Sequence, residues 1–233
     1  MGACPLGSLQ AVLGSKKFNM SFYVFGLLML FGVVLGRFIC GFLCPFGFFQ
    51  ELLHKIPLPK LKAPQKLDRV LRWFKYAILA LLVLLPIFVT NPYGIAPPYF
   101  CQWICPAGTL EGGIPLLLKN DGLRKMVGFL FNWKLSILIF IVLLSMFIYR
   151  PFCKYLCPLG AFYALFNRVS LYRMEIDTKK CIGCKACERS CPMQVGILVN
   201  CNGGECIRCG KCSDACPADA IRMGFIKLKN REN

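Results

Sequence analysis

The chain has 233 residues, of which 57% are hydrophobic and 17% are charged, and its formal net charge at pH 7 is +17. An ordinary soluble domain is about 45–50% apolar and about 25% charged, so this composition excludes a simple soluble domain. Sixteen cysteines accompany a single histidine, His54, which excludes bis-histidine haem. The sequence also contains no C-x-x-C-H haem attachment motif and neither of the usual glycine-rich phosphate loops for ATP and NAD.

Three segments are apolar enough to be predicted as membrane helices, at residues 18–36, 73–90 and 127–149. A helix needs about 20 largely apolar residues to cross a bilayer, and each segment reaches or approaches that length. Asn132 and Lys134 interrupt the third segment, so its strongest part is residues 135–149. We therefore predict an α-helical integral membrane region with about three spans over residues 1–170.

The distribution of lysine and arginine predicts how these spans are oriented. Cytoplasmic loops carry an excess of positive charge, and the loop between the first two spans is the richer one. This loop and the C-terminal segment are therefore predicted to be cytoplasmic in a multi-pass protein of the inner (plasma) membrane. An odd number of spans leaves the N-terminus outside without a leading helix, so we expect a first helix upstream of this chain. The net charge is attributed to topology and anionic headgroups, and no nucleic-acid partner is predicted.

A Cys-Pro-x-Gly motif occurs four times, and three copies have a second cysteine four residues earlier. The predicted topology places Cys40, Cys44, Cys153 and Cys157 on the cytoplasmic side, and four thiolates are the ligand set of a 4Fe–4S cluster. Cys4, Cys101 and Cys105 fall on the opposite side, where a further cluster would need an upstream cysteine. Redox dithiols, a zinc or copper site and inert buried thiols remain alternatives for these motifs.

The C-terminal segment contains two identical cysteine runs. They are Cys181-x2-Cys184-x2-Cys187-x3-Cys191-Pro192 and Cys206-x2-Cys209-x2-Cys212-x3-Cys216-Pro217. This spacing is typical of two-cluster bacterial ferredoxins, in which the fourth cysteine of each run ligates the other cluster. The first cluster is predicted to bind Cys181, Cys184, Cys187 and Cys216, and the second Cys206, Cys209, Cys212 and Cys191. Residues 171–233 are therefore predicted to form an α+β two-cluster ferredoxin domain, with Cys201 as a spare thiol.

The combination of C-x3-C-Pro motifs beside membrane helices with a double ferredoxin module resembles a known family. It resembles the membrane ferredoxin subunit of periplasmic nitrate reductase systems, the C-terminal part of the nitrous-oxide reductase regulator and a polyferredoxin-like branch found in anaerobes. The resemblance implies a membrane protein that passes electrons between the quinone pool or cytosolic donors and outside redox partners. The chain departs from the four-helix family in its three spans and in the additional motif at Cys101–Pro106.

The sequence thus predicts a membrane iron–sulfur electron carrier, not an enzyme, that links a ferredoxin, flavoprotein or quinone-linked donor to a membrane or extracytoplasmic redox partner. A hydrocarbon core of about 30 Å is too thick for one efficient electron jump, so such a relay needs centres at both faces. No catalytic residue is predicted, and the carboxylates before the ferredoxin segment, such as Glu51 and Asp68, are expected to be solvated or interfacial. An assembly or regulatory factor for a partner metalloenzyme and a membrane dithiol relay are the alternatives.

Overall fold

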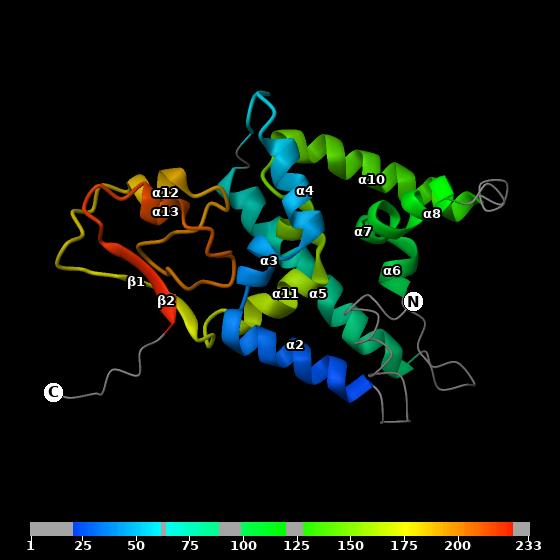
Figure 1. Ribbon diagram of the computed structural model, residues 1–233, viewed down its shortest axis with the longest axis horizontal. Coiled ribbons are helices and arrows are strands. Elements are labelled where there is room, and N and C mark those ends of the chain that lie inside the picture. Colours follow the sequence, from blue (N-terminus) through cyan, green and yellow to red (C-terminus); the bar gives the residue numbers. More distant parts are fainter. Residues whose placement is uncertain (1–20, 62–63, 89–98, 120–127, 226–233) are drawn as a thin grey trace. The chain divides into compact units, whose positions relative to one another are not determined.

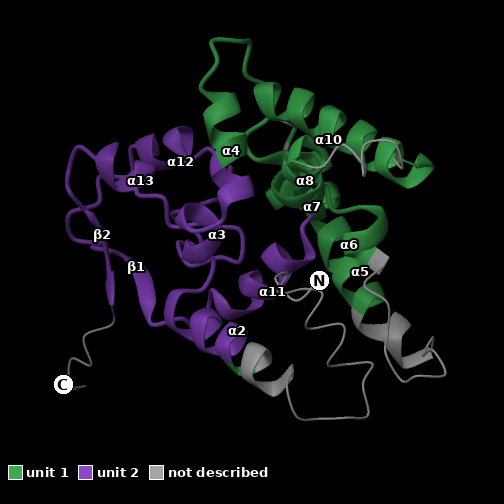
Figure 2. Cartoon of the chain, turned by 45° about the vertical axis from the view of Figure 1, so that its right-hand side comes forward, with its two compact units in different colours: residues 1–26, 49–156 green, residues 27–48, 157–233 purple. Residues whose placement is uncertain are grey.

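The computed structural model describes residues 21–61, 64–88, 99–119 and 128–225, and the chain divides into two compact units. Unit 1 comprises residues 1–26 and 49–156, and unit 2 comprises residues 27–48 and 157–233 (Figure 2). Unit 2 therefore joins the ferredoxin segment to the first described helix and to the segment that follows Cys157. The sequence predicts a domain boundary between residues 170 and 171, and this boundary stays a prediction.

The described part of unit 1 is helical (Figure 1). It contains most of α4 (Pro45–His54) and then α5 (Gln65–Phe88), α6 (Tyr99–Trp103), α7 (Pro106–Gly108), the π-helix η1 (Thr109–Gly113), α8 (Ile114–Lys119), α10 (Phe129–Phe147) and the π-helix η2 (Phe152–Leu156). Helix α5 packs against η2, while α10 packs against α7 and η1. Leu61 N–H also donates to Phe147 O at 3.0 Å, which ties the loop after α4 to the end of α10.

Among the described residues, one helix is long and apolar enough to cross a membrane, and that helix is α10. Its 19 residues extend about 28 Å at 1.5 Å per residue, close to the thickness of a bilayer core. Only 17% of the most apolar 18-residue stretch of α10 is buried in the protein. A core helix of a soluble protein would be mostly buried. Helices α2 (Ser21–Leu35) and α5 overlap the first two predicted spans but do not meet this test over the described residues, so three spans stay a prediction.

Unit 2 combines helices with a small sheet. It contains most of α2, then α3 (Phe38–Phe42), α11 (Pro158–Phe166), β1 (Tyr172–Ile176), α12 (Ala186–Ser190), α13 (Lys211–Asp214) and β2 (Ile221–Phe225). The two strands pair antiparallel, with Met174 opposite Met223. The buried core of this segment contains Met174, Ile197 and Ile221. It also contains three cysteines of the two runs, Cys187, Cys206 and Cys212. Cysteines thus supply much of the interior that aliphatic side chains fill in other small domains.

The backbone of the ferredoxin segment repeats itself along the two cysteine runs. Left-handed residues occur at matching positions in both runs, namely Gly183 and Arg208, Lys185 and Gly210, and Gln194 and Asp219. Helices α12 and α13 begin at matching points, because Lys185 and Gly210 are their respective N-caps. The two runs therefore fold into two copies of one motif, as their identical spacing indicates.

Two glycines let the bend between α2 and α3 approach the ferredoxin segment within unit 2. Gly36 has a φ of +56°, and a Cβ atom there would lie 2.8 Å from Asn167 Oδ1. A Cβ atom on Gly41 would lie 2.9 Å from the Ile207 carbonyl oxygen. Since real Cβ atoms essentially never come that close to another heavy atom, a larger residue would push these segments apart. We call residues 35–41, with both glycines, the α2–α3 corner.

Candidate metal centres

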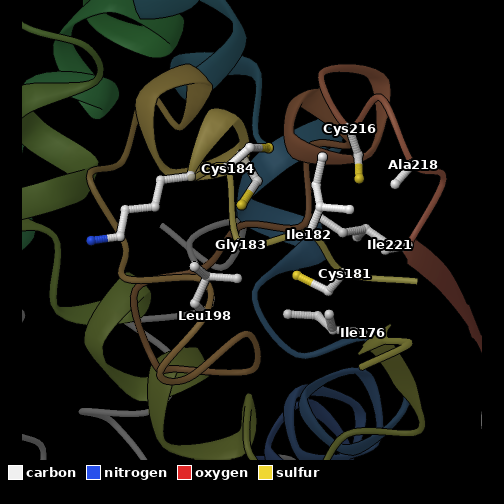
Figure 3. A pocket seen from close by; sticks show the side chains of 12 residues that line it. Ile176, Cys181, Ile182, Gly183, Cys184, Leu198, Cys216, Ala218 and Ile221 are labelled. Carbon is white, nitrogen blue, oxygen red and sulfur yellow. The ribbon is translucent and has the colours of Figure 1, made fainter. Parts of the chain in front are cut away.

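The first candidate centre is a pocket of about 350 Å³, including its open mouth, lined by Cys181, Cys184, Cys187 and Cys216. Three of these cysteines lie in or just before α12, and the fourth follows α13 in the other run. Figure 3 shows the sulfur atoms of Cys181, Cys184 and Cys216 among apolar side chains of the lining. The remaining lining is almost entirely aliphatic, and it includes Ile176, Ile182, Leu198 and Ile221.

The second candidate centre is a matching pocket of about 320 Å³, lined by Cys191, Cys206, Cys209 and Cys212. Again three cysteines come from one run and the fourth from the other. Its lining includes Met174, Met193, Ile197 and Ile207, and also the charged residues Arg208 and Lys211. The structure therefore brings together, in each pocket, the four cysteines that the sequence groups as one ligand set, and their role as ligands stays a prediction.

Burial disfavours the charged thiolate form of the cysteines in these pockets. Desolvation is the main cause that raises the pKa of Cys206 to about 11 and the pKa of Cys212 to about 12. It also raises the pKa of Cys187 and of Cys209. Neighbouring cysteines add to the effect, because negative charges on nearby sulfur atoms repel one another. Four thiolates in so apolar a pocket would therefore need a cationic partner.

Within the described residues, no group of three or more histidine, cysteine, aspartate or glutamate side chains is arranged so that it could hold a metal ion. A cubane cluster is larger than one ion, because its four iron atoms and four sulfides lie between the protein thiolates. Its ligands surround the cluster instead of converging on one point.

The cysteines of the repeated Cys-Pro-x-Gly motif lie at helix starts. Pro45, Pro106 and Pro158 begin α4, α7 and α11, and proline is favoured there because its missing N–H would have no partner in the first turn. Cys157 is the N-cap of α11, and its sulfur accepts a hydrogen bond from Gly160 N at 3.4 Å. Backbone N–H groups at a helix start stabilise negative charge on such a sulfur atom.

The structure distributes the motif cysteines over both units. Cys40, Cys44 and Cys157 belong to unit 2, while Cys101, Cys105 and Cys153 belong to unit 1. Cys153 is buried in η2, and the others are half-buried. Cys4 lies outside the described residues. A cluster held by Cys40, Cys44, Cys153 and Cys157, and one that involves Cys4, Cys101 and Cys105, both stay predictions.

Two buried arginines precede motif cysteines by three residues, and each binds a carboxylate within its own unit. Arg37 is 1% exposed, and its Nη1 lies 2.9 Å from Glu205 Oε2. Arg150 is equally buried and binds Glu51. The sequence shows both arginines but not their partners, because these partners are distant in the chain. The expectation that Glu51 is merely solvated or interfacial is wrong, since it neutralises a buried cation.

Asp68 on α5 is the second carboxylate whose surroundings differ from the expectation. It is only 5% exposed and binds Arg72 of its own helix. Its Oδ1 also lies 2.5 Å from Lys154 Nζ and accepts a hydrogen bond of 2.6 Å from the Tyr155 hydroxyl. Lys154 is 2% exposed, so the group forms a buried ionic cluster that joins α5 to η2. The sequence does not indicate this cluster, because both partners in η2 are distant from Asp68 in the chain.

Comparison with known families identifies the repeated part of the chain. The sequence profile of a family described as "4Fe-4S binding domain" matches three times in succession, at residues 20–64, 73–120 and 133–176. These matches cover more than half of the chain, and each contains one C-x3-C-Pro motif. The chain belongs to this 4Fe–4S binding family. Two further profiles with the same description match residues 173–196 and 202–222, and each match contains one complete cysteine run.

Several curated proteins are similar to this member of the family. An uncharacterized protein of Methanocaldococcus jannaschii is 34% identical over 71% of this chain and 62% of its own length. The methylamine utilization ferredoxin-type protein MauN of Paracoccus denitrificans is 31% identical over 67% of this chain and 48% of its own. The ferredoxin-type protein NapH of Haemophilus influenzae is 26% identical over 71% of this chain and 51% of its own.

The chain thus spans about half to three fifths of the length of these relatives. No solved structure matches it. The resemblance to a polyferredoxin-like 4Fe–4S protein, which rests on the cysteine motifs, is confirmed by these relatives and by the family profiles. Cluster binding of the 4Fe–4S type is therefore established for the family, and the number and place of the clusters in this chain are matters for proposal.

Proposed function

We propose that the protein is an iron–sulfur electron carrier whose unit 2 holds two 4Fe–4S clusters, one in each cysteine pocket. The observation that carries this proposal is the pairing within the pockets, where each contains three cysteines of one run and the last cysteine of the other. Two-cluster bacterial ferredoxins use this exchange of fourth ligands. The ferredoxin-type names of the relatives agree with it.

The residues of the pockets fit such clusters in their chemistry. Cysteine thiolates are the ligands that iron–sulfur clusters use, and the aliphatic lining limits access of water to the cofactor. When bound, each cluster accepts and donates one electron at a time. The protein's own part is to place the two cofactors beside each other and to set their potentials through burial, charge and hydrogen bonds. A protein with that role needs neither a proton donor nor a substrate pocket, so the role is that of a carrier rather than an enzyme.

We further propose that the carrier works at the plasma membrane, with its ferredoxin segment in the cytoplasm. Helix α10 supports a membrane location through its length and its exposed apolar surface. A third cluster is proposed at Cys40, Cys44, Cys153 and Cys157 because the C-x3-C-Pro motif recurs and because each copy lies within a match to the 4Fe–4S family. Electrons would then pass between a cytoplasmic donor or the quinone pool and a partner in or beyond the membrane.

The iron content tests the third cluster. The purified protein, kept anaerobic, is expected to contain about 12 iron atoms per chain, because three cubanes carry four each. Replacement of Cys40 or Cys153 by serine should lower this number by about four and remove one component of the electron paramagnetic resonance (EPR) spectrum.

The matched control is Cys201→Ser. Cys201 is a free thiol whose sulfur lies 3.4 Å from Met174 O, outside both cysteine pockets. This variant should keep all of its iron. A value of about eight in the unmodified protein, unchanged in Cys40→Ser and Cys153→Ser, would confine the clusters to unit 2 and favour a dithiol role for the motif.

A further inference from the structure

The two cysteine runs have the same backbone but opposite surroundings. In the first run, the loop between Cys181 and Cys184 is exposed, and the Ile182 side chain is 70% accessible to solvent. In the second run, the matching residues Ile207 and Arg208 are buried, at 3% and 1%. One loop of this twofold arrangement therefore faces solvent, while its twin is covered by other parts of unit 2.

Arg208 occupies a position where its twin is glycine. Gly183 and Arg208 have φ values of +69° and +53°, in the left-handed region that favours glycine and strains other residues. A Cβ atom on Gly183 would meet nothing within 4 Å, so the first loop makes no use of a side chain there. An arginine that is held in a strained conformation and is fully buried must gain its stability from the contacts of its side chain.

These contacts tie the second loop to the ends of two helices. Arg208 Nη1 donates to Leu35 O at 3.0 Å, where α2 ends. Its Nη2 donates to Asn167 O and to Ser170 Oγ, both at 2.7 Å, where α11 ends. The last carbonyl groups of a helix lack partners within it and carry partial negative charge, so they attract a guanidinium group. Arg208 thus satisfies the C-terminal ends of α2 and α11 at once.

Other side chains reinforce the same junction. Asn167 Nδ2 donates to Gly203 O at 2.7 Å and to Cys206 O at 3.0 Å. Arg37 Nη1 donates to Gly204 O at 2.6 Å. The segment that leads into the second cysteine run is therefore fixed to the α2–α3 corner through its backbone as well as through Arg208.

The junction brings a cysteine motif close to the second pocket. Gly41 lies against the Ile207 carbonyl oxygen, so closely that a Cβ atom would not fit. Cys40 is the neighbour of Gly41 in the chain, and Cys206, which lines the second pocket, is the neighbour of Ile207. The backbone of the Cys40 and Cys44 motif therefore lies close to the backbone that follows Cys206 of the second pocket.

We propose that Arg208 is a positioning residue that holds the second centre against the α2–α3 corner, so that the second centre is the inner station of the relay and the first is the outer one. This inference rests on the proposed function. In this order a soluble one-electron donor or acceptor would exchange electrons with the first centre, and the second centre would link the first to the centre proposed at Cys40. At each step the donor is oxidised by one electron and the acceptor is reduced by one, and no bond or proton changes place.

Relaxation measurements on the full-length protein in detergent test this order. A water-soluble gadolinium chelate speeds the EPR relaxation of paramagnetic centres near solvent, and Cys184→Ser and Cys209→Ser assign the spectral components to the two pockets. In the unmodified protein the chelate should act on the first centre much more than on the second. Equal effects on both centres would overturn the proposal. Absence of iron or of both components would instead refute the proposed function.

Arg208→Gly gives the second loop the glycine that the first loop has at the matching position, Gly183. It also relieves the backbone strain, so it isolates the role of the side chain. Arg208 donates three hydrogen bonds, and each hydrogen bond to a charged group contributes roughly a tenfold factor in equilibrium, so the undocked fraction of the second loop should rise by up to about a thousandfold. The chelate should then act on the second centre as on the first. Arg208→Lys keeps the charge but lacks the planar fork, and should restore the shielding only in part. A second centre that stays shielded in Arg208→Gly would overturn the proposal.

Gly41→Ala tests the junction without touching Arg208, in case the arginine variants fail to fold. The added Cβ would lie 2.9 Å from a backbone oxygen, which has no flexible side chain to move aside. This variant should expose the second centre to the chelate while its iron content stays unchanged. Gly224→Ala is the matched control, because a Cβ atom there meets nothing within 4 Å, and it should behave as the unmodified protein. Equal shielding in Gly41→Ala and Gly224→Ala would count against the inner position.

Discussion

Replacement of Cys191 by serine is expected to remove the second iron–sulfur centre, although Cys191 belongs to the first cysteine run. The structure places Cys191 in the second pocket, together with three cysteines of the second run, Cys206, Cys209 and Cys212. The variant should lose up to about four iron atoms, because a cubane held by three thiolates is labile. Cys216→Ser should have the converse effect on the first centre, since Cys216 lines the first pocket.

EPR spectra of the reduced protein identify which centre is lost. The component that disappears in Cys191→Ser should be the one that disappears in Cys209→Ser, and it should persist in Cys184→Ser. Cys201→Ser again serves as the control with unchanged iron. Should Cys191→Ser abolish the component that depends on Cys184, the ligand sets would follow the linear order of the sequence, and the assignment of the two pockets would be refuted.

A second large effect is expected for Asp68→Ala in unit 1. The substitution leaves Lys154 buried without its carboxylate, and it removes the acceptor of the Tyr155 hydroxyl. Removal of one partner from a buried ion pair typically costs about 3–5 kcal/mol, because the remaining charge stays uncompensated in a poorly polar environment. The melting temperature of the helical unit, followed by circular dichroism in detergent, should therefore fall sharply.

Glu51→Ala provides a matched comparison for this prediction. Its carboxylate also binds a buried cation, Arg150, but its side chain is 25% exposed, so water can partly replace it. The loss of stability should therefore be smaller than in Asp68→Ala. The double variant Asp68→Leu with Lys154→Met should recover part of the stability relative to Asp68→Ala, since it removes the desolvation cost of Lys154 and leaves only Arg72, whose side chain is 16% exposed, without the carboxylate. Equal melting temperatures for Asp68→Ala and the unmodified protein would show that the cluster contributes nothing.

The features that the sequence predicts are those determined by local spacing. The identical runs from Cys181 and from Cys206 predict the twofold arrangement of the ferredoxin segment, because cysteine spacing alone decides which thiols can surround a cluster. The three copies of the C-x3-C-Pro motif that include both cysteines likewise correspond to the three family matches. The apolar run within residues 127–149 predicts α10, whose bounds are Phe129 and Phe147.

The features that the sequence does not predict depend on long-range contacts. Asp68 reads as an ordinary surface carboxylate at the start of a helix, and only folding brings Lys154 and Tyr155 to it. Arg208 has no local pattern that indicates its contacts with Leu35 and Asn167. One signal was present nevertheless, since the matching position of the first run is Gly183. The converse exchange, Lys185 in the first run for Gly210 in the second, leaves an exposed side chain, so it is burial that distinguishes Arg208.

The junction around Arg208 also constrains how the chain can mature. Its bond to Leu35 joins residues 173 positions apart, so the carbonyl group at the end of α2 waits for this partner until Arg208 has left the ribosome. Contacts of such high sequence separation form late, because the intervening segment loses conformational entropy before any stability is gained. The contact between the end of α2 and the second cysteine run therefore forms only after both have been synthesised, and a chain that terminates shortly before Cys206 would lack it.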